Sequence, residues 1–369
     1  MRRTQLVLCL FSILTSACNK GENRSFSSWY EARYEKSACL ESLPEARTFT
    51  TFSDSLLVDS IYRSMMGPYE RKNFEIESSD SLIWIVGYEV EVLGSDSASA
   101  QFLCHSNLNL QEAKKLPWSS NFESYNSRVF TLSQGIDSVR FPIGFGIPLP
   151  GTQVFELVSQ VLNHNIRPVN AQVQHRIKLH YYNESDLECA LRPLDQQAIF
   201  IFKQYEGPQG LFGQEANKVD RLRQPSCGFE EVIIADSSAP FNQFHDPQGR
   251  RFTGHWKVFP GEERIKMDIT QLLKPKDEVF IHFILCHVHP FCEELILRDE
   301  TEGRELYRSN IQSYAEGIGL IQVPFYSSRE GLELKEGHLY SLESYYNNRS
   351  SDTLSAMSVM YTYTSVHWC

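Results

Sequence analysis

Two histidines separated by one residue close the most apolar stretch of the sequence. His287 and His289 end a run from position 279 that is rich in β-branched and aromatic residues, a composition typical of a buried β-strand. Side chains at positions i and i+2 of a strand point to the same face, so both imidazoles can approach one metal ion. A His-x-His also occurs as two ordinary surface residues, and only a further ligand would favour a metal site.

A methionine in a second strand-like run, at positions 354–363, offers that further ligand. Thioether sulfur suits Cu(I) and imidazole accepts either oxidation state of copper, so His287, His289 and Met357 together predict a copper site. The alternative for Met357 is a place in the core, because methionine side chains fill gaps between sheets.

From about Phe141 onward the sequence resembles the copper type II, ascorbate-dependent monooxygenases, the family of dopamine β-monooxygenase and the peptidylglycine hydroxylating enzyme. The matching stretches are 144–146, 160–165, 285–289, 297–299, 335–339 and 357–361. The resemblance implies two β-sandwich domains, a catalytic copper on His287, His289 and Met357, and Tyr361 near the substrate. A register shifted by three residues would instead place Leu354 at the methionine position.

The same family holds a second copper, for electron transfer, on a pair of adjacent histidines and a third histidine from another strand. Here the pair reads Cys104-His105, and the third position falls near Leu162, two residues before His164. Cys104, His105 and His164 would form a site of one thiolate and two imidazoles for copper or zinc. Alternatively, Cys104 is in a disulfide and His105 makes a local hydrogen bond, and the chain then binds one copper instead of two.

The N-terminus has the pattern of a secretory signal. Basic residues at positions 2–3 precede an apolar stretch at 6–14, and Ala17 stands directly before Cys18. This pattern resembles the lipobox of bacterial lipoproteins, in which that cysteine is acylated. We therefore expect a signal peptide at 1–18, a tether at 19–28 and an exported chain anchored to a bacterial membrane, in the periplasm or at the cell surface. The alternative is plain secretion, with Cys18 free or in a disulfide.

The remaining sequence predicts an all-β protein of two tandem antiparallel β-sandwich (jelly-roll-like) domains. Short strand-like runs alternate with turn signals, and no helical periodicity of useful length occurs. We place the domains at 29–193 and 194–369, with an inserted loop at about 204–228. With 41% hydrophobic residues in 369, two cores can form. The formal charge of −11 argues against nucleic acid as a partner.

Cysteines outside the signal fit an oxidising compartment. Seven remain, at positions 39, 104, 189, 227, 286, 292 and 369, so up to three disulfides can form with one thiol over. Cys286 and Cys292 flank the His-x-His and are spaced to pair across a turn.

Three functional hypotheses follow from these features. We favour an exported copper-dependent monooxygenase that hydroxylates a C–H bond of a small substrate with O2 and an ascorbate-type reductant. The alternatives are a single-copper binding lipoprotein of the same fold without turnover, and a metal-independent surface binding module. The peptide-hydroxylating relative has an arginine two residues before the His-x-His, where this sequence has Leu285, so peptidylglycine is a disfavoured substrate.

Overall fold

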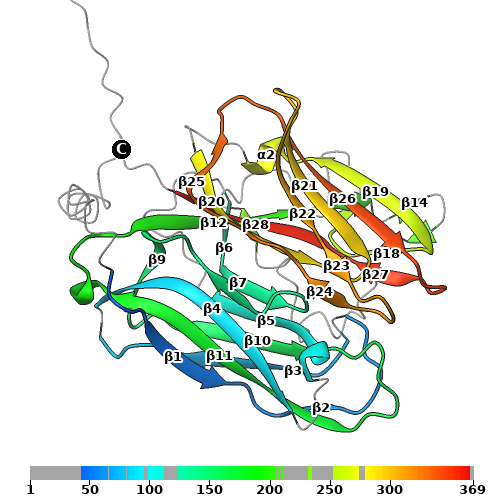
Figure 1. Ribbon diagram of the computed structural model, residues 1–369, viewed down its shortest axis with the longest axis horizontal. Coiled ribbons are helices and arrows are strands. Elements are labelled where there is room, and N and C mark those ends of the chain that lie inside the picture. Colours follow the sequence, from blue (N-terminus) through cyan, green and yellow to red (C-terminus); the bar gives the residue numbers. More distant parts are fainter. Residues whose placement is uncertain are drawn as a thin grey trace, which may run out of the picture.

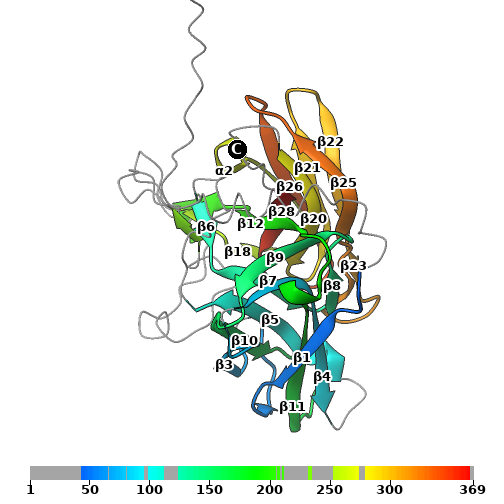
Figure 2. The same cartoon turned by 90° about the vertical axis from the view of Figure 1, so that its left-hand side faces the viewer.

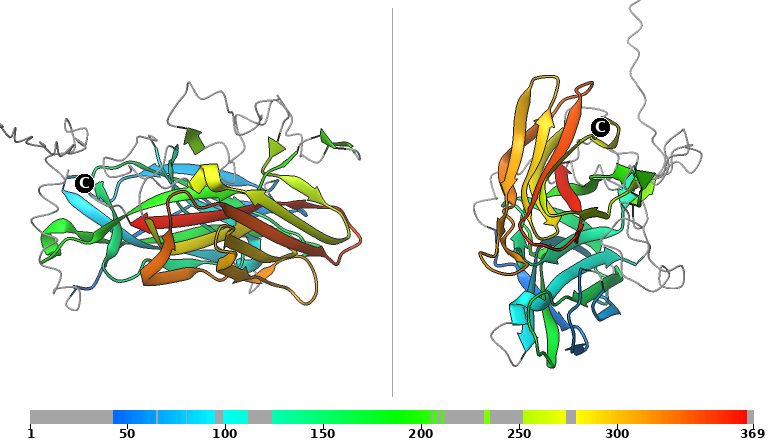
Figure 3. Two further views of the ribbon diagram at one scale, coloured as in Figure 1. Left: turned by 90° about the horizontal axis from the view of Figure 1, so that it is seen from above. Right: turned by 90° about the vertical axis from the view of Figure 1, so that its right-hand side faces the viewer.

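The computed structural model confirms an all-β architecture of antiparallel sandwiches. It describes residues 43–365, apart from 65, 80, 95–98, 112–123, 205, 208–209, 212–231, 235–251 and 274–278. Figures 1 and 2 show the first sandwich below the second, and Figure 3 shows both from two further sides. The sequence-predicted signal, tether and Cys18 lie outside the described residues, as does most of the expected loop at 204–228.

The first sandwich contains the strands before residue 184. Their bounds are β1 Arg47–Phe52, β2 Leu56–Val58, β3 Tyr69–Phe74, β4 Leu82–Gly94, β5 Leu103–Leu110, β6 Ser124–Asn126, β7 Arg128–Ser133, β8 Ser138–Arg140, β9 Phe145–Pro150, β10 Phe155–Val161 and β11 Ala171–Asn183. The sheet β1-β11-β4-β9 packs against the sheet β3-β10-β5-β7. Short 3-10 turns lie at Ser99–Phe102 and Glu184–Asp186.

The second sandwich begins with β12, at Arg192–Phe200. The other elements are β13 Lys203–Gln204, β14 Glu206–Gly207, β15 Gly210–Leu211, β16 Val232–Ile234, β17 Phe252–Thr253, β18 Trp256–Val258, β19 Gly261–Asp268, α2 Thr270–Leu273, β20 Val279–Val288, β21 Cys292–Asp299, β22 Arg304–Asn310, β23 Gln312–Ser313, β24 Leu320–Gln322, β25 Tyr326–Leu334, β26 Tyr340–Asn348, β27 Leu354–Ala356 and β28 Ser358–Ser365. The sheet β12-β28-β20-β25 packs against β19-β26-β21-β22.

One sheet runs through both sandwiches. β12 pairs in parallel with β9 over only two residue pairs, and this joins the strand order β1-β11-β4-β9-β12-β28-β20-β25. Aromatic rings fill the junction: Phe141 lies 5.3 Å from Phe283 and 5.0 Å from Tyr363, measured between ring centroids. The two sandwiches therefore share one continuous hydrophobic core.

Among the described residues, no helix has the length and apolar character needed to cross a membrane.

Candidate metal centre

The strand register brings the sequence-predicted ligands of the second domain onto one face. In the antiparallel pair β20–β28, Leu285 lies opposite Tyr361 and His287 opposite Val359. The pairing continues past the strand ends, because the N–H of His289 donates to the carbonyl oxygen of Met357 at 3.2 Å. Facing residues of an antiparallel pair share a side of the sheet, and so do residues two apart. His287, His289, Met357 and Tyr361 therefore lie on the same side, and all four are buried.

Hydrogen bonds to Nδ1 hold each imidazole with Nε2 turned away. His289 Nδ1 lies 3.1 Å from the carbonyl oxygen of Ser355. A carbonyl can only accept, so Nδ1 carries the proton and Nε2 keeps its lone pair. His287 Nδ1 shares a hydrogen bond of 3.2 Å with the hydroxyl of Ser133, which comes from β7 of the first sandwich. His287 Nε2 is buried and has no hydrogen-bond partner. This is the orientation that metal-binding histidines require.

The pair belongs to a larger group of imidazoles at the junction of the sandwiches. His105, His164 and His255 lie close enough to His287 or His289 to lower the pKa of one or the other. Burial is the main cause of the shift in each case, and it lowers the pKa of His289 to about 3 and those of His164 and His255 to about 4. All of them are neutral near pH 7, which is the form that binds metals.

The sequence gives no signal for His255, because no other histidine or cysteine stands near it in the chain. The structure places its ring centroid 5.9 Å from that of His289, while the His287 and His289 centroids are 5.8 Å apart. The signal was absent because a lone histidine 32 positions before the His-x-His has no diagnostic spacing; only the pairing of β18 with β27 brings the two segments together.

The structure does not bring the three candidate ligands of the first domain together. Cys104 is a buried thiol, so the disulfide that we considered for it from the sequence does not form. Its neighbour His105 lies opposite Ser133 and Gln160 in the strand register, and a shift in that register falls at Cys104. His164 lies farther along, in a small pocket between the sandwiches beside Pro290 and Ser355. Ligand atoms of Cys104, His105 and His164 are not all within 4.8 Å of one another.

The prediction that Cys286 and Cys292 pair in a disulfide is wrong. Both residues are buried thiols. Cys286 is on the face of β20 opposite to that of His287, and Cys292 begins β21 in the other sheet of the sandwich. Burial raises the pKa of the Cys286 thiol to about 12, so it is neither a thiolate nor a ready metal ligand. Of the described cysteines, Cys189 is disulfide-bonded.

Another cluster brings three ligand atoms within 4.8 Å, on Asp299, Glu302 and His338. His338 Nδ1 donates to Asp299 at 2.7 Å, and Lys335 Nζ donates to Glu302 at 2.6 Å. These contacts join the β21–β22 turn to the β25–β26 turn. Because the polar atoms already bond to each other, we interpret the cluster as a structural link.

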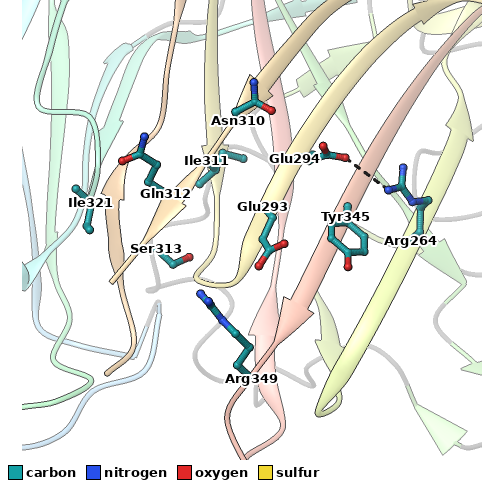
Figure 4. A pocket seen from close by; sticks show the side chains of 10 residues that line it. All are labelled: Arg264, Glu293, Glu294, Asn310, Ile311, Gln312, Ser313, Ile321, Tyr345 and Arg349. Atoms are coloured by element: carbon teal, nitrogen blue, oxygen red, sulfur yellow. Dashed lines mark ion pairs between the residues drawn. The ribbon is translucent and has the colours of Figure 1, made fainter. Parts of the chain in front are cut away.

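A polar pocket of about 690 Å³ lies on the outer face of the sheet β19-β26-β21-β22 (Figure 4). Two of its charged residues are paired: Glu294 lies 3.5 Å from Arg264 and 2.6 Å from Arg308, and Arg264 covers the ring of Tyr345 at 4.8 Å. The pocket is separate from the imidazole group and contains no histidine or cysteine.

No family model and no curated protein matches this sequence. Among solved structures, the chain is similar to a peptide-N(4)-(N-acetyl-beta-D-glucosaminyl) asparagine amidase, at 6% identity and TM-score 0.36, over 86% of this chain and 96% of that one. It is also similar to PNGase F from Flavobacterium meningosepticum, at 7% identity, TM-score 0.36 and the same coverage. The STIV MCP gives 10% identity and TM-score 0.31, over 87% of this chain and 97% of that one. Likeness at this level carries no argument about function.

Proposed function

We propose that this chain is a copper protein whose single copper is held by His287, His289 and Met357. The observation that carries the proposal is the orientation of the imidazoles. Nδ1 of each histidine is engaged in a hydrogen bond, and His287 Nε2 is buried on the same face as Met357 with no partner. Leaving such an atom unsatisfied costs about 1–3 kcal/mol, which a metal bond would offset.

The side chains around this centre have defined tasks. Ser133 and the carbonyl of Ser355 fix the ring orientations through Nδ1, which leaves Nε2 of each ring as the nitrogen that would bind the metal. Tyr361 lies two residues after Val359, which is opposite His287, and on the same face of the sheet. At that position it would border a small-molecule substrate. Copper, when bound, supplies one-electron and O2 chemistry. We accordingly propose monooxygenase-like oxidation of a C–H bond, with an ascorbate-type reductant as electron source.

The separation of Cys104, His105 and His164 supports one copper instead of two. Without an electron-transfer copper, we expect hydroxylation driven by ascorbate to be slow. The single-copper binding protein without turnover is the second candidate, and this separation is the observation that favours it.

Metal analysis of the purified chain tests the proposal. We expect one copper per chain in the wild type and a much lower copper affinity in His287→Ala. His282→Gln is a matched control on the same strand, because His282 stacks on Phe145 at 4.2 Å and its Nδ1 donates to the carbonyl of Ser328. A wild-type chain without copper would overturn the proposal, and two coppers would restore the two-centre interpretation.

A further inference from the structure

Two strand registers place Met357 between a pair of histidines. Trp256 lies opposite Ala356 in the pair β18–β27, so the next residues in the same antiparallel register are His255 and Met357. On the other side, the N–H of His289 donates to the carbonyl of Met357. The segment at Met357 thus runs between His255 and His289, and their rings come within 5.9 Å of each other.

This ring spacing fits coordination of a common ion. A metal lies about 2.0–2.1 Å from an imidazole nitrogen, and that nitrogen is about 1.1 Å from the ring centre, so two rings on one ion have centroids at most about 6.4 Å apart. The His287–His289 separation of 5.8 Å and the His255–His289 separation of 5.9 Å both satisfy this limit. His289 is the middle ring of the three.

We propose that His255 is a third imidazole ligand of this centre, an inference that rests on the proposed copper site. The three nitrogens are not all within 4.8 Å of one another in the described conformation, so binding turns the ring of His255 towards the other two. His255 stands between β17 and β18, outside both strands.

A third imidazole changes which ions the centre prefers. Two imidazoles and a thioether form a set suited to copper in both oxidation states, whereas three imidazoles suit Cu(II) and Zn(II). The centre would therefore hold Cu(II) firmly and also accept Zn(II), with Met357 as a weaker, additional ligand.

Pulsed EPR of the Cu(II)-loaded full chain counts the imidazoles on copper directly. We expect three in the wild type and two in His255→Ala, with one copper per chain in both and a Cu(II) affinity at least about 10-fold lower in the variant. His164→Ala is the matched control, since His164 also lies near His289, and it should retain three.

Two imidazoles in both the wild type and His255→Ala would overturn this inference and leave the copper site standing. A wild type that binds no copper would overturn the proposed function and the inference together. His255→Gln, a larger polar replacement, provides a second variant in case His255→Ala does not fold, and it should also show two imidazoles.

Discussion

In the proposed metal centre, His287 and His289 each depend on a neighbour that fixes the ring orientation, and for His287 this neighbour comes from the other sandwich. Removing the Ser133 hydroxyl frees the ring to rotate and leaves Nδ1 without its partner. We expect Ser133→Ala to weaken copper binding by roughly 10–100-fold, the usual loss for an outer partner of a metal-bound histidine.

Titration with copper under a competing chelator measures this change. Ser159→Ala is the control, because the Ser159 hydroxyl is buried in the same sandwich and has no hydrogen-bond partner. Equal copper affinity in Ser133→Ala and the wild type would contradict the role assigned to the hydroxyl.

His175 should make the stability of the fold depend on pH. Burial lowers the pKa of this histidine to about 4, and neither ring nitrogen has a hydrogen-bond partner. In the unfolded chain its pKa is about 6.5, so below that pH the unfolded state takes up the proton first. Because of this titration, the free energy of unfolding should decrease by about 1.4 kcal/mol for each unit by which the pH is lowered, from about 6.5 to about 4.

Urea unfolding of His175→Leu at several pH values checks this expectation. In the variant, the free energy of unfolding should decrease less steeply with falling pH, by about 1.4 kcal/mol per pH unit over the same range. The same pH dependence in the variant and the wild type would show that His175 does not contribute. Above pH 6.5 the histidine is neutral in both states, so its titration has no effect there.

At the scale of single residues, the sequence predicted that the second-domain candidate ligands share one face of the sheet, and it did not predict that the first-domain candidates lie apart. His287 and His289 follow from the two-residue period of a strand, and that period needs no tertiary information. Cys104 lies at a register shift in the pairing of β5 with β10, which that period does not predict. His255 joins the group only through the pairing of β18 and β27, which no local pattern reveals.

Among the elements, the buried strands were predictable and the charged ones were not. The run that forms β20 is apolar on both faces because both faces are covered. β19 reads Gly-Glu-Glu-Arg-Ile-Lys-Met-Asp and β22 reads Arg-Glu-Leu-Tyr-Arg-Ser-Asn, and neither contains the run of β-branched and aromatic residues that indicates a strand. Cross-strand ion pairs stabilise them, for example Arg308 of β22 with Glu294 of β21 at 2.6 Å.

One glycine packs closely against the backbone at the end of β10. A Cβ added at Gly67 would overlap the carbonyl oxygen of Val161, next to the register shift between Gln160 and Val161. Gly67→Ala must therefore displace backbone, and we expect it to lower the free energy of unfolding by more than about 2 kcal/mol. Gly303→Asn is the control, because nothing lies within 4 Å of a Cβ there and asparagine tolerates the positive φ of 65°. Equal denaturation midpoints for the two variants would contradict the argument.

For the whole molecule, hydrogen bonds across the junction predict that both sandwiches unfold together. Gln134 accepts from the N–H of Leu320 at 2.8 Å, Asn165 donates to the carbonyl of Ile318 at 2.9 Å, and Tyr363 donates to the carbonyl of Val129 at 2.7 Å. We expect one calorimetric transition for the full chain. Tyr363→Phe leaves a buried carbonyl unsatisfied, at about 1–3 kcal/mol, and should shift that single transition downward without splitting it. Two resolved transitions in the wild type would contradict the shared core.

Location in the cell is a separate prediction, which rests on sequence alone. We propose that Cys18 becomes the acylated first residue and holds the chain at a membrane surface. Intact mass of protein extracted from membranes should show a chain beginning at Cys18 with added acyl mass, and Cys18→Ser should release the protein into the soluble fraction. A mature chain that begins at another residue would contradict the lipid anchor.

The position of β28 has a consequence for biosynthesis. This strand lies between β12 and β20 in the sheet, and it follows both of them in the sequence by at least 70 residues. While a ribosome or translocon delivers the chain from its N-terminus, the place between β12 and β20 stays empty, and the edge that each strand presents to β28 remains unpaired. The second sandwich can therefore close only after nearly all of the chain has emerged, and until then its strands are candidates for chaperone binding.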